Sequence, residues 1–353
     1  MTGIGRRTVL KAVAGGIVLG VPDVAFAVPR TTVVLPDDRC IRYLGRWQPQ
    51  PDGSVIGYFQ SGLEFDFVGT SVSVTLGNTC RLLYRVDGGP VQRNITATGT
   101  VVLASGLENT KHSVQVYSEY QQSFPRVKYF EVGQVVPAAK RPTMEVIGDS
   151  ISVGYIGPGL VNSLGNSFSY KTPELLGMSH NTIAFGGIAM TPGFGSPDKS
   201  GMLNRYTKLS EYVPGEVNVP EWDTSRYVPD YVVINLGTND STSPNFTPAY
   251  LAFLRNLRGY YPDVTIIAMS PFNTNHRDEI AEVAGTTGDL FVDTTGWIDR
   301  ATETTDGTHP TVAAHDKIAG KLAAAIQQLT PLPSLPKISS RRASAMSTTP
   351  AGR

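Results

Sequence analysis

The stretch TMEVIGDSISVGY, residues 143–155, contains a mainly apolar run that ends in Gly148, Asp149 and Ser150. An apolar run without regular polar alternation is typical of a strand that is buried on both faces of a parallel sheet. Gly148, Asp149 and Ser150 mark a sharp turn at the end of that strand. The stretch alone leaves open whether Ser150 only forms the turn or acts as a nucleophile, because a nucleophile also needs a base and donors for an anion.

The pattern of this stretch recurs further along the chain. Apolar strands alternate with segments of helical period, such as FTPAYLAFLRNLRGYY and TVAAHDKIAGKLAAAIQQL. Strands that alternate with helices predict a parallel sheet between two layers of helices. We therefore predict an α/β domain over residues 143–330. The apolar strands of this domain include MEVIG, NTIAF, DYVVINLG and VTIIAMS.

Residues 30–136 show a shorter period. Apolar and polar side chains alternate in short runs, and turn residues such as Asp87-Gly88-Gly89 separate the runs. Seven or more such runs are typical of an antiparallel β-sandwich. Residues 137–142, PAAKRP, then predict a short stiff linker. The runs are SVIGYF, LEFDF, SVSVTL, LLYRV, TVVLA, HSVQVY and VKYFEV.

The two ends of the chain have compositions of their own. Residues 1–27 place Arg6 and Arg7 before a weakly apolar run and end in AFA, which is the order of a twin-arginine export signal. An amphipathic N-terminal helix is the alternative. No later run is long and apolar enough for a membrane helix, so we expect a secreted or extracytoplasmic protein without an integral membrane segment after cleavage. Residues 331–353 are rich in Pro, Ser and Ala and predict a disordered tail.

The charge balance limits the partners. The 30 basic and 30 acidic side chains cancel to a formal charge of zero, and no basic cluster follows the first residues. Nucleic acid is therefore not an expected partner, whereas a sugar or an ester suits a neutral surface. The sequence leaves the oligomeric state open.

The only two cysteines are Cys40 and Cys80, an even number in a chain with an export signal. A disulfide between them is a plausible expectation for an oxidising compartment, and two free thiols are the alternative. Two cysteines without nearby histidines do not make a zinc site, and no ligand spacing for calcium stands out. We expect no metal and no cofactor.

Four short blocks follow predicted strands or precede the last helix. They are GDS at 148–150, AFGG at 184–187, GTND at 237–240 and DGTH at 306–309. Open α/β sheets bind ligands at the carboxyl ends of their strands, so these blocks are expected to meet. Each block alone is also compatible with a turn or a helix cap.

Together and in this order, the blocks resemble those of the SGNH, or GDSL-type, hydrolase superfamily. The resemblance implies a flavodoxin-like, three-layer α/β domain and a serine esterase site. It implies Ser150 as nucleophile, His309 as base and Asp306 as the group that orients the base. Gly187, Asn239 and the backbone of Ser150 would form the oxyanion hole.

The chemistry of these residue types agrees with the roles that the resemblance implies. A glycine at position 187 lets a backbone N–H approach an anion without a Cβ in the way. The Asn239 amide supplies a neutral donor. Ser150 is expected at a strand-to-helix turn, where the start of the helix favours an anion. Asp149 and Asp240 are expected to provide supporting hydrogen bonds.

The remaining histidines are expected to have packing or surface roles. Of these, only His276, in a loop after the fourth predicted strand, is a candidate for lining the cleft. The others are His112, His180 and His315.

A second resemblance covers both predicted domains. A sandwich placed before an SGNH domain, with RYLGRW at residues 42–47 and WDTSRYVPDYVVINLGTND at 222–240, resembles the two-domain carbohydrate esterases of family two, which are similar to acetylxylan esterases. The sandwich would then be jelly-roll-like. Members of that group often lack the acid and work with a Ser-His pair, whereas Asp306 is present here. This departure leaves the subfamily and the substrate open.

The leading hypothesis is a secreted serine esterase. It would hydrolyse short-chain O-esters of carbohydrates, with acetyl as the expected acyl group, through an acyl-serine intermediate, and its partner would be an acylated carbohydrate or a small ester. Acyl transfer, or lipase action on another ester, would use the same residues. A carbohydrate-binding protein without catalysis is the alternative of a different class.

Overall fold

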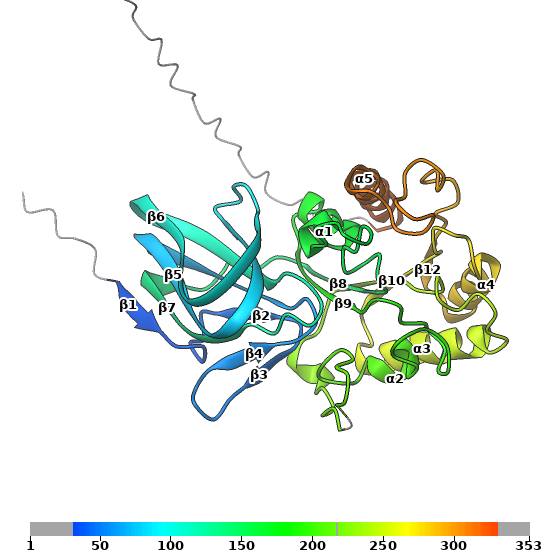
Figure 1. The fold of residues 1–353 in the computed structure, drawn as a ribbon, viewed down its shortest axis with the longest axis horizontal. Helices are drawn as coiled ribbons and strands as arrows, with labels where there is room; N and C mark the ends of the chain where they lie inside the picture. The colour runs from blue at the N-terminus through cyan, green and yellow to red at the C-terminus, as the bar shows by residue number, and fades with distance from the viewer. Residues whose placement is uncertain (1–30, 217, 331–353) are drawn as a thin grey trace, which may run out of the picture.

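The computed structural model describes residues 31–216 and 218–330. Two domains lie side by side, with an antiparallel sheet in the first and a helix-covered parallel sheet in the second (Figure 1). Residues 137–142 lie between the last strand of the first domain and the first strand of the second. The export signal expected over residues 1–27 and the tail expected over 331–353 lie outside the described residues.

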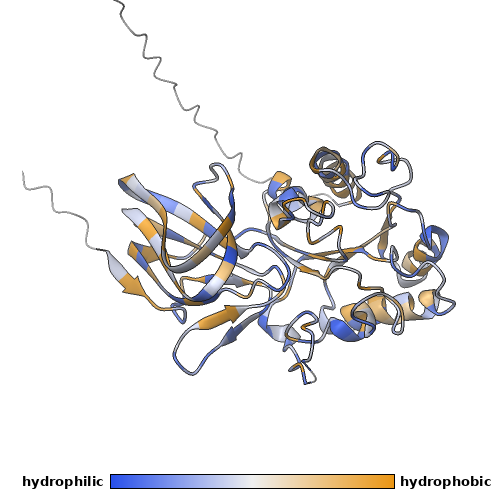
Figure 2. Cartoon of the chain, in the orientation of Figure 1, coloured by the Kyte–Doolittle hydropathy of each residue, from blue (hydrophilic) through white to orange (hydrophobic). Residues whose placement is uncertain are grey.

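The first domain is a seven-stranded antiparallel sheet in the order β2-β5-β7-β4-β3, in which β1 also pairs with β7 and β6 with β5. Hydrophobic and hydrophilic segments alternate along its strands (Figure 2), as the sequence pattern predicts. The strands are β1 (Thr32–Val34), β2 (Arg42–Leu44), β3 (Trp47–Pro49), β4 (Val55–Gly57), β5 (Gly62–Val86), β6 (Gln92–Ser118) and β7 (Arg126–Val136).

Two of these strands are much longer than the predicted short runs. β5 joins three of the runs in 25 residues, and β6 joins two in 27. Shifts of register, for example between Gly69 and Ser71, let β5 and β6 bend without ending their pairing. Residues 114–117 of β6 pair with both ends of β5, so the sheet is nearly closed.

The expected disulfide between Cys40 and Cys80 is not formed. Cys80 lies in β5 within the apolar core, where burial raises the pKa of its thiol to about 11. Cys40 lies in the turn between β1 and β2 and is partly exposed. Both residues are free thiols, because one side chain belongs to the sheet core and the other to a turn outside it.

The second domain confirms the predicted α/β class. Its sheet is parallel throughout, in the order β12-β11-β10-β8-β9. The strands are β8 (Thr143–Gly148), β9 (Ser179–Ala184), β10 (Tyr231–Asn235), β11 (Thr265–Met269) and β12 (Leu290–Val292). The helices are η1 (Leu164–Asn166), α1 (Phe168–Leu175), α2 (Gly201–Arg205), η2 (Thr224–Arg226), α3 (Phe246–Tyr260), α4 (Arg277–Thr287) and α5 (Val312–Leu329).

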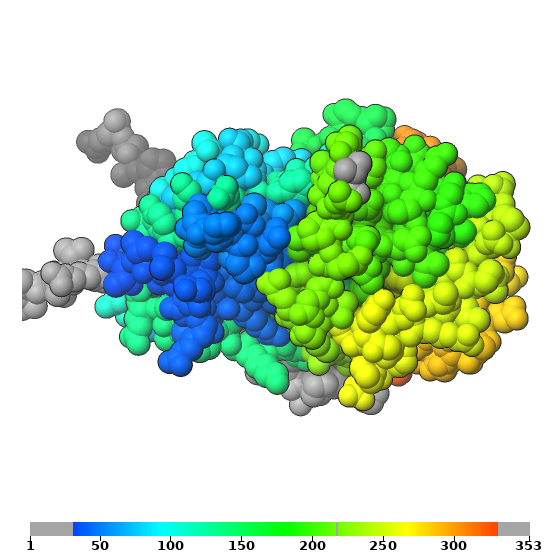
Figure 3. Space-filling view, turned by 90° about the horizontal axis from the view of Figure 1, so that it is seen from below, coloured from blue at the N-terminus to red at the C-terminus, as the bar shows by residue number. Residues whose placement is uncertain are grey.

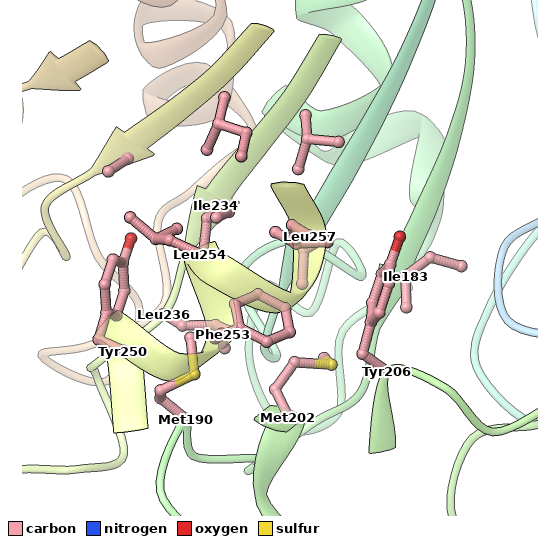
Figure 4. Packing of buried hydrophobic residues seen from close by; sticks show 14 of the residues in the cluster. Ile183, Met190, Met202, Tyr206, Ile234, Leu236, Tyr250, Phe253, Leu254 and Leu257 are labelled. Atoms are coloured by element: carbon pink, nitrogen blue, oxygen red, sulfur yellow. The ribbon is translucent and has the colours of Figure 1, made fainter. Parts of the chain in front are cut away.

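Neighbouring residues of each strand point to opposite faces of this sheet. Ile147 and Ile234 pack in one core with residues of α2, α3 and α4, whereas Val146 and Val233 pack in another with α1 and α5. Figure 4 shows Ile234 of the sheet and Phe253 of α3 among the side chains of the first core. The sheet is therefore the middle of three layers, as predicted (Figure 1).

The domains meet along the edge of the parallel sheet. Gln60 pairs antiparallel with Thr182 of the edge strand β9, through N···O distances of 3.2 and 3.4 Å. Arg46 is buried at this boundary and donates to the backbone carbonyls of Tyr206 and Lys208. The two domains form one continuous surface in the space-filling view (Figure 3).

None of the helices in residues 31–216 and 218–330 is both long and apolar enough to cross a membrane.

Phe253 tests the packing of the α3 layer. Its side chain is 1% exposed, so Phe253→Ala should lower the free energy of unfolding by about 3 to 5 kcal/mol through lost burial and an unfilled cavity. Urea unfolding followed by fluorescence and circular dichroism measures this change. Val228→Ala, at a side chain that is 60% exposed, is the control and should change stability by less than about 0.5 kcal/mol. Equal effects of the two substitutions would contradict the packing described.

Candidate active site

Ser150, His309 and Asp306 form a continuous hydrogen-bonded chain. The Ser150 Oγ lies 2.8 Å from His309 Nε2, and His309 Nδ1 lies 2.7 Å from Asp306 Oδ2. An ionised carboxylate can only accept, so Nδ1 carries the proton and Nε2 is free to accept the proton of the serine hydroxyl. The structure thus brings together the three residues predicted from two blocks that are far apart in the sequence.

Asp306 also holds the backbone of its own turn. Its Oδ1 accepts the N–H groups of Thr308 and His309 at 3.1 and 2.9 Å. Partial burial raises the pKa of the carboxyl, but the hydrogen bonds from His309 and Thr308 lower it by more, so the net pKa lies below its ordinary value. Asp306 therefore remains ionised beside the imidazole at neutral pH.

The helix that we expected directly after Ser150 is not formed. Only turns follow β8, and the next regular helix is the short η1. Gly154 has a φ of +81°, and Gly157, Pro158 and Gly159 follow it in the loop. These residues interrupt helical geometry, so Ser150 lies at a strand-to-loop turn and the predicted contribution of a helix dipole is wrong.

Gly187 has a backbone conformation that favours glycine. Its φ is +79°, and a Cβ at this position would lie 1.8 Å from the carbonyl oxygen of Ser196. Among the described residues, the N–H groups of Gly187 and Ser150 have no hydrogen-bond acceptor. Both groups are therefore available to an oxyanion.

Asn239 and Asp240 connect the GTND block to the loop after β9. The Asn239 Nδ2 donates to the carbonyl of Ile188 at 2.9 Å, which leaves its second hydrogen available. Asp240 is fully buried and accepts the N–H groups of Met190 and Thr191 at 2.8 and 2.9 Å. Asp240 therefore supports the site through hydrogen bonds, as predicted.

Asp149 is buried beneath the nucleophile. Its Oδ1 accepts the N–H of Ile151 at 3.0 Å. Burial raises the pKa of this carboxyl to about 6, although the Ile151 hydrogen bond acts in the opposite direction. Burial in the folded protein therefore disfavours the charged form of Asp149.

Two further residues at the site were missed by the sequence analysis. The ring of Tyr155 packs edge-on against the His309 imidazole, with centroids 4.5 Å apart. Thr305 donates from its N–H to the carbonyl of His309 at 3.0 Å and from its hydroxyl to that of Ile156 at 2.6 Å. Tyr155 lies just after the GDS block and Thr305 just before Asp306, so their nearness in sequence to the blocks was the one available signal.

His276 supports the GTND turn through a stacking contact and a hydrogen bond. Its ring stacks on Phe246 with centroids 3.9 Å apart, and its Nε2 bonds to the carbonyl of Asp240 at 2.8 Å. His180 and His315 are fully buried, and burial lowers the pKa of His315 to about 3. His112 bonds to Asp87 in the sandwich domain. These four histidines have the packing and supporting roles expected of them.

Residues 31–216 and 218–330 contain no group of three His, Cys, Asp or Glu side chains that could hold a metal ion.

The model of the GDSL-like Lipase/Acylhydrolase family matches residues 146–317, which contain all four blocks. The α/β domain is therefore similar to the domains of that family. The match confirms the resemblance found from the sequence.

Comparisons that include both domains point to family two carbohydrate esterases. Cellulase/esterase CelE of Acetivibrio thermocellus is 31% identical over 330 residues, which cover 82% of this chain and 40% of CelE. A family two carbohydrate esterase from Clostridium thermocellum, solved in complex with cellohexaose, is 29% identical, with a TM-score of 0.67 over 82% of this chain and 98% of that chain. The chain thus spans less than half the length of its curated relative.

The two-domain fold also occurs in more distant proteins. The acetyl xylan esterase Est2A from Butyrivibrio proteoclasticus is 20% identical, with a TM-score of 0.70 over 85% of this chain and 98% of that chain. This likeness shows that the sandwich and the α/β domain are arranged as in Est2A.

Gly187→Ala tests the predicted oxyanion donor. The new Cβ would collide with the Ser196 carbonyl, a backbone atom, so the loop must move and the N–H with it. We expect kcat for an ester substrate to fall by about a hundredfold or more. Gly193→Ala is the matched control, because Gly193 also has a positive φ, +89°, but a Cβ there meets nothing within 4 Å. Similar losses in both variants would show that backbone strain alone is responsible.

Asp149 should make stability depend on pH in an unusual direction. The unfolded chain releases this proton near 3.8, whereas the folded protein keeps it to about 6. The contribution of Asp149 to stability is thus complete below pH 3.8 and is lost as the pH rises through 6.

Over that window, the wild type should lose about 3 kcal/mol relative to Asp149→Asn, which cannot ionise. Urea unfolding of both proteins between about pH 3.5 and pH 7 measures the difference, because Asp149 differs in protonation between the folded and unfolded states over roughly this range. Parallel stability curves for the two proteins would refute the assignment.

Proposed function

We propose that the protein is a serine esterase that removes short acyl groups, with acetyl as the leading candidate, from carbohydrate hydroxyls. The observation that carries this proposal is the Ser150–His309–Asp306 chain of hydrogen bonds beside unoccupied donors. The family match and the family two relatives support ester hydrolysis and a carbohydrate substrate.

In the proposed reaction, Ser150 Oγ attacks the ester carbonyl while its proton passes to His309 Nε2. The N–H groups of Ser150 and Gly187 and the Asn239 amide stabilise the tetrahedral oxyanion. Asp306 stabilises the imidazolium that forms. As the intermediate collapses, the C–O bond to the alcohol breaks and His309 returns the proton to that alcohol.

Water then completes the cycle. His309 takes a proton from a water molecule, which attacks the acyl-Ser150 ester and releases the carboxylic acid and the free serine. Attack by a second hydroxyl in place of water would give acyl transfer with the same residues. Product analysis with an added sugar acceptor distinguishes the two outcomes.

The preference for a carbohydrate is supported by the similarity to a family two carbohydrate esterase that was solved in complex with cellohexaose. The arginine pair and AFA sequence in residues 1–27 support export by a twin-arginine route, which would place the enzyme where polysaccharides occur.

Ser150→Ala tests the proposed nucleophile. The variant should lose at least about 10³-fold in kcat, because the acyl-enzyme cannot form. Release of acetate from acetylated xylan and mannan, and of p-nitrophenol from esters of increasing chain length, measures activity and acyl preference. His309→Ala should be nearly as inactive, whereas Asp306→Ala should retain more activity if its backbone neighbours still hold the imidazole.

Ser105→Ala is the control for the nucleophile experiment, because Ser105 is an exposed serine of β6 in the sandwich domain. It should keep full activity. Wild-type turnover by Ser150→Ala would refute the mechanism, and glycan binding without any ester hydrolysis by the wild type would instead favour a binding protein.

A further inference from the structure

A loop of the sandwich domain contacts the predicted oxyanion hole. This β6–β7 loop, residues 119–125, connects the two strands after which it is named. The Oε1 of its Gln121 side chain accepts the backbone N–H of Gly186 at 2.7 Å. Gly186 directly precedes Gly187, whose free N–H is a proposed oxyanion donor. A residue of the first domain thus holds the backbone of the second one residue before the proposed donor.

The other side of Gly187 is held from within the α/β domain. Asn239 bonds to the carbonyl of Ile188, and Asp240 to the N–H groups of Met190 and Thr191. The turn also has backbone hydrogen bonds of its own, because the Phe185 carbonyl accepts the Ile188 N–H at 3.3 Å and the Gly187 carbonyl accepts the Ser196 N–H at 3.0 Å. The peptide that joins Gly186 to Gly187 has no hydrogen bond among the described residues, and two consecutive glycines give it more backbone freedom than any other pair. The Gln121 hydrogen bond holds the Gly186 N–H directly before this peptide.

The β6–β7 loop is itself anchored to the α/β domain by a buried carboxylate. Glu211 is fully buried, and its Oε1 accepts the N–H of Gln122 at 2.8 Å. Its Oε2 accepts the N–H of Phe59, also from the sandwich domain, at 2.7 Å. Gln121 is therefore presented from a backbone with little freedom to move.

The start of the loop is anchored near the nucleophile. Glu119 is fully buried and accepts the hydroxyl of Ser163 at 2.6 Å, and its carbonyl accepts the N–H of Leu164 at 2.8 Å. Gln60 of the same domain donates to the carbonyl of Val153 at 2.9 Å, three residues after Ser150. The sandwich domain thus holds both the loop that follows Ser150, through Val153, and the loop that follows β9, through Gly186.

We propose that Gln121 is a positioning residue for the oxyanion hole, so that the sandwich domain supplies part of the catalytic geometry. This inference rests on the proposed esterase function. Gln121 touches no reacting atom in the proposed mechanism and acts through the Gly186–Gly187 backbone. Its loss should therefore weaken binding of the transition state more than binding of the ester.

Gln121→Leu removes the acceptor while keeping a side chain of similar size. We expect kcat for p-nitrophenyl acetate to fall by about tenfold to a hundredfold, with KM within about twofold of the wild type. The affinity for phenylboronic acid, which forms a tetrahedral anionic adduct with an active serine, should fall by a similar factor. Rates are normalised to the fraction of Ser150 that reacts with a fluorophosphonate, which corrects for misfolded protein.

Gln122→Asn is the matched control. Gln122 is the next residue of the loop, its side chain points instead to the carbonyl of Tyr212 at 3.3 Å, and asparagine tolerates its positive φ of 60°. The control should keep the wild-type kcat and boronic acid affinity, and both variants should keep the wild-type melting temperature to within a few degrees.

An unchanged kcat in Gln121→Leu would overturn the proposal. A rise in KM with unchanged kcat would also overturn it, because Gln121 would then contact the substrate directly. If the wild type fails to hydrolyse acetyl esters, the proposed substrate is wrong, but the boronic acid comparison still decides whether Gln121 positions the oxyanion hole.

Discussion

Asp240 uses both oxygens of a buried carboxylate to hold the backbone of a different loop. It follows β10, whereas the residues that it binds follow β9, and β8 lies between these two strands in the sheet. The hydrogen bonds therefore bridge the strand that carries Ser150. Two N–H donors directed at one carboxylate compensate for its burial, and the bridge holds the GTND turn to the loop that follows β9. The other contacts of the site refine a geometry that this bridge sets.

Much of the α/β domain could be predicted because its long elements repeat one period. α3 and α5 coincide closely with the two quoted helical segments, and both have one buried face. α1 contains Pro173, α4 begins after a histidine with a positive φ, and β12 has only three residues. Such elements have little local signal and form because the neighbouring layers bury them. The sequence pattern did not show that β5 and β6 each join several short runs into one strand, because a β-bulge interrupts the alternation without ending the strand.

The residues of the site also fall into a group that the sequence predicts and a group that it does not. Ser150, Gly187, Asn239, Asp306 and His309 could be predicted because each lies in a short block, and because the carboxyl ends of parallel strands meet at one edge. Gln121 could not be predicted, because its only relevant contact crosses from one domain to the other. The strand-to-loop turn after Ser150 was also missed, although the glycines at 154, 157 and 159 were visible in the sequence. Local blocks identify chemical groups, but not the supports that come from distant parts of the chain.

The near closure of the first sheet has a consequence for the order in which the protein matures. Residues 114–117 of β6 pair with β5 at both of its ends, for example Tyr117 with Gly62 and with Leu83. The β6–β7 loop leaves the sheet at this seam. Gly62 and Tyr117 are much closer in the chain than Ser150 and His309, which are 159 residues apart. Because pairings between distant residues form slowly and the N-terminal domain is synthesised first, the seam can close before the Ser–His–Asp chain forms. The loop that carries Gln121 would then already be in place when the parallel sheet is completed.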